Sequence, residues 1–191
     1  VSAANVGISL LSPAIPQLRD DLMVTSDEAQ LVLSAFLIML GFGQLIAGSL
    51  SDRIGRRPVL VYGSLLFVLS GFGALLANSI EMLVFMRILQ GLGAAACMAM
   101  GRVIISDSFQ HAEAGRQMST ITMFQSVVPL LGFSFGGVLA DLVGWRGSVG
   151  LMVVTAAIVF AGASMLLAES RDPSIKPCLL YTSPSPRDLS T

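Results

Sequence analysis

Six long apolar runs, separated by short polar breaks, decide what this chain can fold into. A helix needs about 20 apolar residues to cross the hydrocarbon core of a bilayer. The runs cover residues 1–18, 28–50, 58–77, 80–106, 117–143 and 147–168. Several exceed the length of a strand, and apolar and polar residues do not alternate with a period of two along them. We therefore expect an all-α membrane protein with six transmembrane helices, the first entered mid-span because the chain opens without a start Met.

The composition agrees with a membrane protein. Apolar residues make up 54% of the chain and charged residues 12%, which is too little charge to cover a soluble domain of this length. The net charge of -1 gives no indication of nucleic-acid binding. The sequence also holds no metal-binding, nucleotide-binding or nucleophile motif. We therefore expect neither an enzyme nor a resident cofactor or metal.

The basic residues of the breaks lie mainly on one side of the predicted membrane. The breaks after the second, fourth and sixth runs hold the larger group, which is Arg53, Arg56, Arg57, Arg116, Arg171 and Lys176. The other side holds only Arg19 and Arg146. Because loops rich in Lys and Arg stay in the cytoplasm, both chain ends are expected to be cytoplasmic. Trp145 lies on the opposite side and fits an aromatic anchor at the interface.

A ten-residue motif at 48–57 (GSLSDRIGRR) recurs at 137–146 (GVLADLVGWR). Both copies keep Gly, Leu, Asp, Gly and Arg at the same spacing, and each lies in a break between two apolar runs. Three runs begin between the two copies, so the copies are expected on opposite faces of the membrane. A duplicated unit whose second copy is inverted is typical of secondary transporters. The six helices are therefore predicted to form a 3+3 inverted repeat.

Residues 48–60 (GSLSDRIGRRPVL) resemble the cytoplasmic signature of the major facilitator superfamily, Gly-x-Leu-x-Asp-Arg-x-Gly-Arg-Arg. Gly48 lets another helix approach, and Asp52 needs a cationic partner because the C-terminal end of a helix disfavours a negative charge. Arg56 and Arg57 follow the Gly55 turn and can fold back toward that carboxylate. The resemblance implies a conformational latch, worth about 1–3 kcal/mol, that steadies the outward-open state, whereas the alternative is a basic turn that serves orientation alone. The expected latch members are Gly48, Asp52, Arg53, Gly55, Arg56, Arg57 and Asp107.

A second motif, Arg87-Ile-Leu-Gln90-Gly91, resembles the Arg-x-x-Gln-Gly signature of the same superfamily. An arginine near the centre of a bilayer costs at least ~2.5 kcal/mol, so Arg87 is expected to face a cavity or an acidic partner. Gln90 lies one turn along on the same face of the helix. The resemblance assigns Arg87 to proton coupling or to contact with an anion. The alternative is that Arg87 snorkels or binds backbone carbonyls.

The run at 117–143 contains Pro129, Gly132, Gly136 and Gly137. Its glycines resemble the antiporter signature Gly-Pro-x-x-Gly-Gly, although Phe133 replaces the proline. Gly132 and Gly136 lie on one helix face and predict tight packing, and Pro129 can supply a kink one turn earlier. Glycine packing without antiport is an equally good interpretation.

The stretch Ser12-Pro-Ala-Ile-Pro resembles the Leu-Pro-Ala-Leu-Pro start of the bacterial bicyclomycin/chloramphenicol-type drug exporters. Those exporters often carry an Asp in this span, where the present chain has Ser9. No acidic residue lies deep in any predicted span, although proton coupling normally needs a carboxylate. The carboxylate is therefore expected upstream of Val1 or in a missing second half, or else the protein is not proton-coupled.

These resemblances imply the N-terminal six-helix half of a major facilitator transporter, most similar to the drug:proton antiporters. Such a protein lies in the bacterial plasma (inner) membrane and exports drugs or small amphipathic molecules by alternating access, using the proton gradient and no cofactor. Its partners are a small-molecule substrate, the lipid bilayer and a missing C-terminal six-helix half. The expected substrate contacts are Asn5, Phe36, Arg87, Gln90 and Gln125. The alternatives are a facilitator or symporter of a sugar, metabolite or organic anion, and a membrane scaffold or receptor that transports nothing.

The composition changes after residue 168. Residues 169–177 are interpreted as a cytoplasmic linker because they are rich in charge and proline. Residues 178–188 (CLLYTSPSPRD) match the conceptual translation of a transposon-end sequencing adapter, so residues 178–191 are interpreted as an artefact. A natural linker rich in Pro and Ser is the alternative. The expected domain is therefore a six-helix bundle over residues 1–168, with its first span truncated.

Overall fold

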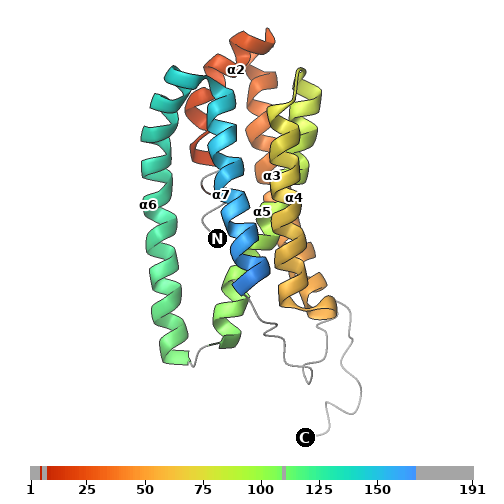
Figure 1. Ribbon diagram of the computed structural model, residues 1–191, viewed down its shortest axis with the longest axis vertical. Helices are drawn as coiled ribbons and strands as arrows, with labels where there is room; N and C mark the ends of the chain where they lie inside the picture. Colours follow the sequence, from red (N-terminus) through yellow and green to blue (C-terminus); the bar gives the residue numbers. More distant parts are fainter. Residues whose placement is uncertain (1–4, 6–7, 109–110, 167–191) are drawn as a thin grey trace, which may run out of the picture.

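The structure, a computed structural model, describes residue 5, residues 8–108 and residues 111–166 (Figure 1). Within these residues the chain forms helices and no strand. The elements are η1 Ser12–Ala14, α2 Ile15–Leu22, α3 Ser26–Ile54, α4 Arg56–Leu75, α5 Ile80–Ser108, α6 His111–Val143 and α7 Trp145–Leu166. The expected all-α class is confirmed for the described residues.

Five of the helices, α3 to α7, are long and apolar enough to cross a membrane. Each lies over one of the apolar runs predicted from residue 28 onward. Breaks of one to four residues separate them, and two of these breaks are the single residues Gly55 and Gly144. The chain is therefore a multi-pass membrane protein.

The first apolar run differs from the expected continuous helix over residues 1–18. Its described part contains a 3-10 turn at Ser12–Ala14, and α2 then continues to Leu22, past the predicted end. Pro13 and Pro16 lie in the first turns of these two segments, where a missing N–H leaves no helical hydrogen bond unmade. Residues 1–4 and 6–7 lie outside the described residues, so this span is described only in part.

Local chemistry fixes both ends of α3. Oγ1 of Thr25 accepts a hydrogen bond from the backbone N–H of Glu28 at 3.3 Å, and the Glu28 carboxylate accepts one from the N–H of Thr25 at 2.8 Å. This capping box starts the helix where the sequence predicts a cap. Gly55, at φ 105°, separates α3 from α4 in a backbone conformation that favours glycine. Gly144, at φ 77°, separates α6 from α7 in the same way.

The two glycine turns lie at opposite ends of the bundle. In Figure 1 the chain passes from α3 to α4 at the lower end and from α6 to α7 at the upper end. The two copies of the ten-residue motif are therefore far apart in space, although they resemble one another in sequence.

The central helix of the bundle is α5, which packs against both α3 and α4. Glycines let the backbones of these helices touch. A Cβ atom at Gly91 would lie 2.6 Å from the carbonyl oxygen of Phe36, and one at Gly93 would lie 2.6 Å from that of Gly63. Any larger residue at either position would force the helices apart, because backbone atoms cannot give way as flexible side chains do.

The helix α6 lies at the edge of the bundle, against η1 and α7 (Figure 1). Only 17% of the residues in its most apolar segment are buried, against 50% in α4. Large apolar side chains are exposed along it, among them Met123, Phe124, Leu130, Phe135 and Leu142. In a membrane protein such a face meets lipid or another helix.

Candidate functional site

The α3–α4 turn gathers charged side chains from three helices. Nη1 of Arg56 lies 2.6 Å from Oδ1 of Asp52 near the end of α3, and its Nε lies 3.2 Å from Oδ2 of Asp107 near the end of α5. Nη1 also donates to Oγ of Ser51 at 2.7 Å. The Arg56 side chain is only 12% exposed, so water and salt screen these contacts less than they would at an open surface. We call Asp52, Arg56 and Asp107 the α3–α4 charge cluster.

Other residues of the first motif copy lie around this cluster. Nη2 of Arg57 donates to the backbone carbonyl of Ser164 in α7 at 3.0 Å, which links a fourth helix to the turn. Arg53 is exposed in the last turn of α3. A Cβ atom at Gly48 would meet nothing within 4 Å in the described chain, so the helix that Gly48 is expected to admit is not among the described helices.

Arg87 lies on α5 inside the bundle, with 1% of its surface exposed. Its Nη1 donates to Oε1 of Gln90 at 2.9 Å and to Sδ of Met152 at 3.6 Å. Its guanidinium carbon lies 5.9 Å from the centre of the Phe36 ring, within the range of a cation–π contact. The surroundings of Arg87 therefore come from α3, α5 and α7.

Three donor nitrogens at this place have no hydrogen-bond partner among the described residues. They are Nε and Nη2 of Arg87 and Nε2 of Gln90. The ion pairs of the described chain involve other residues, so the acidic partner expected for Arg87 is not found in this part of the chain. A buried guanidinium without a counter-charge is costly, because it has lost its hydration and only part of its hydrogen bonds are replaced. The site is therefore chemically suited to an incoming group that carries oxygen acceptors.

Asn5 and Gln125 meet where the first helical segment packs against α6. Nδ2 of Asn5 donates to the backbone carbonyl of Gln125 at 3.2 Å. A Cβ atom at Gly132 would lie 2.6 Å from Cβ of Ser9, and one at Gly136 would lie 2.9 Å from a backbone oxygen of the same segment. These two glycines therefore form a small-residue contact face, as their spacing predicts.

Gly137 does not join this contact face, because a Cβ atom there would meet nothing within 4 Å in the part of the chain that is described. Pro129 lies inside α6, one turn before Gly132. Within the described residues no hydrogen bond or ion pair links Asn5 or Gln125 to Arg87. The predicted substrate contacts therefore fall into two separate groups.

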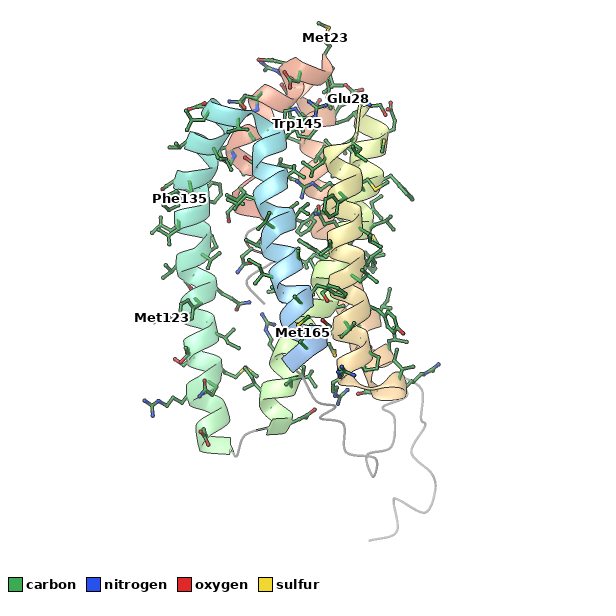
Figure 2. All side chains as sticks on the ribbon, in the orientation of Figure 1. Met23, Glu28, Met123, Phe135, Trp145 and Met165 are labelled. Carbon is green, nitrogen blue, oxygen red and sulfur yellow. The ribbon has the colours of Figure 1, made fainter. Side chains whose placement is uncertain are left out.

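A polar cluster at the α6–α7 turn is not predicted from the sequence. Nε1 of Trp145 donates to Oδ2 of Asp21 at 3.0 Å, and Nη1 of Arg146 lies 3.7 Å from the same oxygen. Trp145 is 1% exposed, so the expectation of an interfacial anchor is wrong. Figure 2 shows Trp145 at the same end of the molecule as Glu28. The repeated motif contains the signal for this cluster, because Trp145 and Arg146 hold the places of the last two arginines of the first copy.

Comparison with known proteins agrees with these motifs. A sequence model of the Major Facilitator Superfamily matches residues 2–178. The chain is 34% identical over 172 residues to a chloramphenicol resistance protein of Pseudomonas aeruginosa, which covers 87% of this chain and 38% of that protein. It is 31% identical over 164 residues to multidrug resistance protein D of Escherichia coli (strain K12), which covers 85% of this chain and 42% of that protein. The chain thus spans about two fifths of the length of these curated relatives.

The fold is also similar to that of a solved transporter. The crystal structure of the human organic anion transporter MFSD10 (TETRAN) matches with a TM-score of 0.65 and 18% identity, over 88% of this chain and 45% of that chain. At this identity the likeness shows a shared fold alone. Because the sequence model covers nearly the whole chain, and both signature motifs lie within it, the chain belongs to the Major Facilitator Superfamily.

Proposed function

We propose that this chain is the first six-helix half of a bacterial secondary transporter that exports drugs or small amphipathic molecules in exchange for protons. The observation that carries the proposal is the buried Arg87–Gln90 pair, whose three donor nitrogens lack partners among the described residues. An ionisable residue inside a transmembrane helix marks an ion or substrate pathway. The similarity to a chloramphenicol resistance protein and a multidrug resistance protein supports drugs as the substrate class.

In this proposal Arg87 takes part in proton coupling. A carboxylate elsewhere in the full-length protein pairs with the guanidinium of Arg87. Protonation of that carboxylate breaks the ion pair and releases the guanidinium. Gln90 orients the guanidinium through its 2.9 Å bond, and Gly91 keeps α3 in contact with α5. The proton gradient supplies the energy, and no cofactor is needed.

The proposed topology is a 3+3 inverted repeat with both chain ends in the cytoplasm. The first unit ends with α4, and the second unit consists of α5, α6 and α7. The two positive-φ glycines, at matching places of the two motif copies and at opposite ends of the bundle, support this arrangement. The arginines of the α3–α4 turn support its cytoplasmic location. The α3–α4 charge cluster then acts as a latch that steadies the closed cytoplasmic face, with Arg53 and Arg57 beside it.

A second six-helix half completes the transporter in this proposal, since the relatives are more than twice as long as the matched part. The first half forms a bundle that ends near residue 168, in the bacterial plasma (inner) membrane. The two halves enclose a cavity near the midplane and expose it to each side in turn. Asn5, Phe36 and Gln125 are proposed to contact the small-molecule substrate together with the Arg87–Gln90 pair.

Export by the full-length protein in drug-sensitive bacterial cells tests this function. Arg87→Ala is expected to abolish resistance and to leave membrane insertion intact. Arg87→Lys keeps the buried charge and is expected to lose export too, because an ammonium lacks the planar donor fork. Arg102→Ala, at an exposed position of the same helix, is the matched control. Unchanged resistance with either Arg87 variant, at normal levels in the membrane, would refute the role of Arg87.

A facilitator or symporter of an organic anion is the second candidate function. The observation that favours it is that the unpartnered nitrogens of Arg87 and Gln90 are all donors, which a carboxylate of the substrate could satisfy directly. The solved transporter of similar fold is an organic anion transporter. Transport of a labelled organic anion that persists after an ionophore collapses the proton gradient would favour a facilitator over drug:proton exchange.

A further inference from the structure

The second copy of the repeated motif lies in a part of the molecule that the proposed export mechanism does not use. It makes the α6–α7 turn, at the end of the bundle opposite the α3–α4 charge cluster (Figure 1). Gly144, with φ 77°, holds the place of Gly55, with φ 105°. Within the described residues these are the only glycines with a positive φ. The two turns therefore share a glycine with a positive φ at the same position of the motif.

The last arginine of each motif copy binds the end of a helix in the other three-helix unit. Nη2 of Arg57, in the first unit, donates to the carbonyl of Ser164 near the end of α7 at 3.0 Å. Nη2 of Arg146, in the second unit, donates to the carbonyl of Ala77 just after α4 at 3.2 Å. In both places a guanidinium meets the C-terminal end of a helix, where the helix dipole favours a cation. The two arginines thus tie the units together at opposite ends.

The residue before that arginine makes a matching contact in each copy. Nε of Arg56 lies 3.2 Å from Asp107, near the end of α5, which is the first helix of the second unit. Nε1 of Trp145 donates to Asp21 at 3.0 Å, at the end of α2, which closes the first helix of the first unit. Arg146 adds a 3.7 Å contact to the same carboxylate and lies 4.3 Å from the centre of the Trp145 ring. Each turn is therefore bound to a carboxylate at the end of the other unit's first helix.

The contact between Trp145 and Asp21 joins a buried donor to a carboxylate whose side chain is 58% exposed. Trp145 is 1% exposed, and a buried indole N–H needs an acceptor, which the Asp21 carboxylate supplies. A hydrogen bond to an ionised acceptor is among the stronger ones in proteins. Nε2 of Gln17 donates at 3.2 Å to Asp141, the aspartate that holds the place of Asp52 in the second copy. Two carboxylates therefore hold the first helix and the α6–α7 turn together.

We propose that Asp21, Trp145 and Arg146 form a second latch, which steadies the state in which the face at the α6–α7 turn is closed. This inference rests on the proposed function, in which the α3–α4 charge cluster is a latch for the opposite face. The two latches act against each other, and their relative strengths set the balance between the outward-open and inward-open states. Asp21 is a positioning residue, because it fixes the end of the first helix through Trp145 and Arg146 and does not contact the substrate.

Distances between spin labels placed across each face of the full-length protein, in lipid nanodiscs, test this inference. Asp52→Asn is expected to move molecules away from the state with a closed cytoplasmic face, and Asp21→Asn to move them in the opposite direction. Each variant should change the ratio of the two states by about two- to tenfold, which corresponds to the difference between a hydrogen bond to a charged acceptor and one to a neutral acceptor. The double variant is expected to return toward the wild-type ratio, because the two losses cancel.

Asp20→Asn is the matched control, since Asp20 is the neighbouring carboxylate and pairs with Arg19 at 2.7 Å instead. Trp145→Phe keeps an aromatic ring in place but removes the N–H donor together with part of the buried indole, so it tests the contact should Asp21→Asn fold poorly. Trp145→Phe is expected to shift the ratio in the same direction as Asp21→Asn. A wild-type ratio in both variants, or a shift in the direction of Asp52→Asn, would overturn the second latch. If the α3–α4 charge cluster is not a latch, the result is distinguishable. Asp52→Asn would then leave the ratio of the two states unchanged, while Asp21→Asn would still shift it.

Discussion

Nη1 of Arg87 donates to Oε1 of Gln90 at 2.9 Å, between two side chains that are both buried in the bundle. The bond uses one donor of the guanidinium and the single side-chain acceptor of the amide. The nitrogens that remain without partners in the described chain can only donate. The pair therefore presents positive charge and hydrogen-bond donors, held in one arrangement by the ring of Phe36 and the sulfur of Met152.

Gln90→Glu is expected to stabilise the protein and to stop export. A carboxylate at this position would neutralise Arg87, and a hydrogen bond to a charged group raises the free energy of unfolding by about 1.5–3 kcal/mol. The new carboxylate would also compete with the coupling carboxylate, so export should fall about tenfold or more. Thermal unfolding and drug efflux from loaded cells measure the two effects. Gln30→Glu, at an exposed position of α3, is the control, and an active Gln90→Glu protein of unchanged stability would contradict the prediction.

Gly93→Ala is expected to destabilise the protein more than Gly41→Ala. A Cβ atom at Gly93 would lie 2.6 Å from the oxygen of Gly63 and 2.7 Å from the nitrogen of Phe67, so α4 and α5 would have to separate. Overpacking of this kind costs about 1–3 kcal/mol. A Cβ atom at Gly41 meets nothing within 4 Å in the described chain, which makes that position the control. Equal unfolding temperatures of the two variants would show that the backbones are not in contact at Gly93.

The two turn glycines are expected to tolerate substitution equally poorly. Gly55→Ala and Gly144→Ala each place an L side chain at a positive φ, which costs about 1–2 kcal/mol. Gly150→Ala, inside α7 with nothing within 4 Å in the described chain, should be neutral or slightly stabilising because alanine favours a helix. Chemical unfolding in detergent compares the three variants. A Gly144→Ala protein as stable as the Gly150→Ala control would speak against a turn that requires glycine.

Single cysteines at positions 53 and 142 are expected to react from opposite sides of the membrane. Arg53 and Leu142 are both exposed, and they flank the two turns that lie at opposite ends of the bundle. In a Cys178→Ser background the buried Cys97 should stay unlabelled. A maleimide that cannot cross the membrane, added to intact cells, should label Leu142→Cys and spare Arg53→Cys. Labelling of both cysteines from one side would contradict the inverted topology, and the proposed function with it.

Helices α3 to α7 could be predicted because a transmembrane helix requires a minimum length of apolar sequence, and polar breaks mark its ends. The pairing of Asp52 with Arg56 could be predicted too, since the two residues are four positions apart around a glycine turn. The end of α2 could not be predicted from hydropathy. The apolar run stops before Asp20 and Asp21, but nothing in these residues stops the helix, which continues to Leu22.

The side of each helix that is buried in the bundle is harder to predict than the helix itself. Lipid is as apolar as a protein core, so apolar residues occur all around these helices and leave no stripe that marks the buried side. Phe36 is grouped with Arg87 from its helical position and does lie beside it, but hydropathy does not indicate that only 1% of Phe36 is exposed. The contact of Trp145 with Asp21 joins residues 124 positions apart: the repeated motif marks Trp145, but no local pattern identifies Asp21 as its partner.

The capping box and Gly55 fix the two ends of α3 and therefore its length, which can be compared with the thickness of the membrane. At 1.5 Å per residue its 29 residues extend about 43 Å, compared with about 30 Å for the hydrocarbon layer. Both ends of α3 therefore reach the headgroup layers, one on each side of the membrane. Each residue turns a helix by about 100°, so deleting one residue from the middle of α3 would rotate Asp52 by about that angle relative to the Thr25 end of the helix, without altering either side chain.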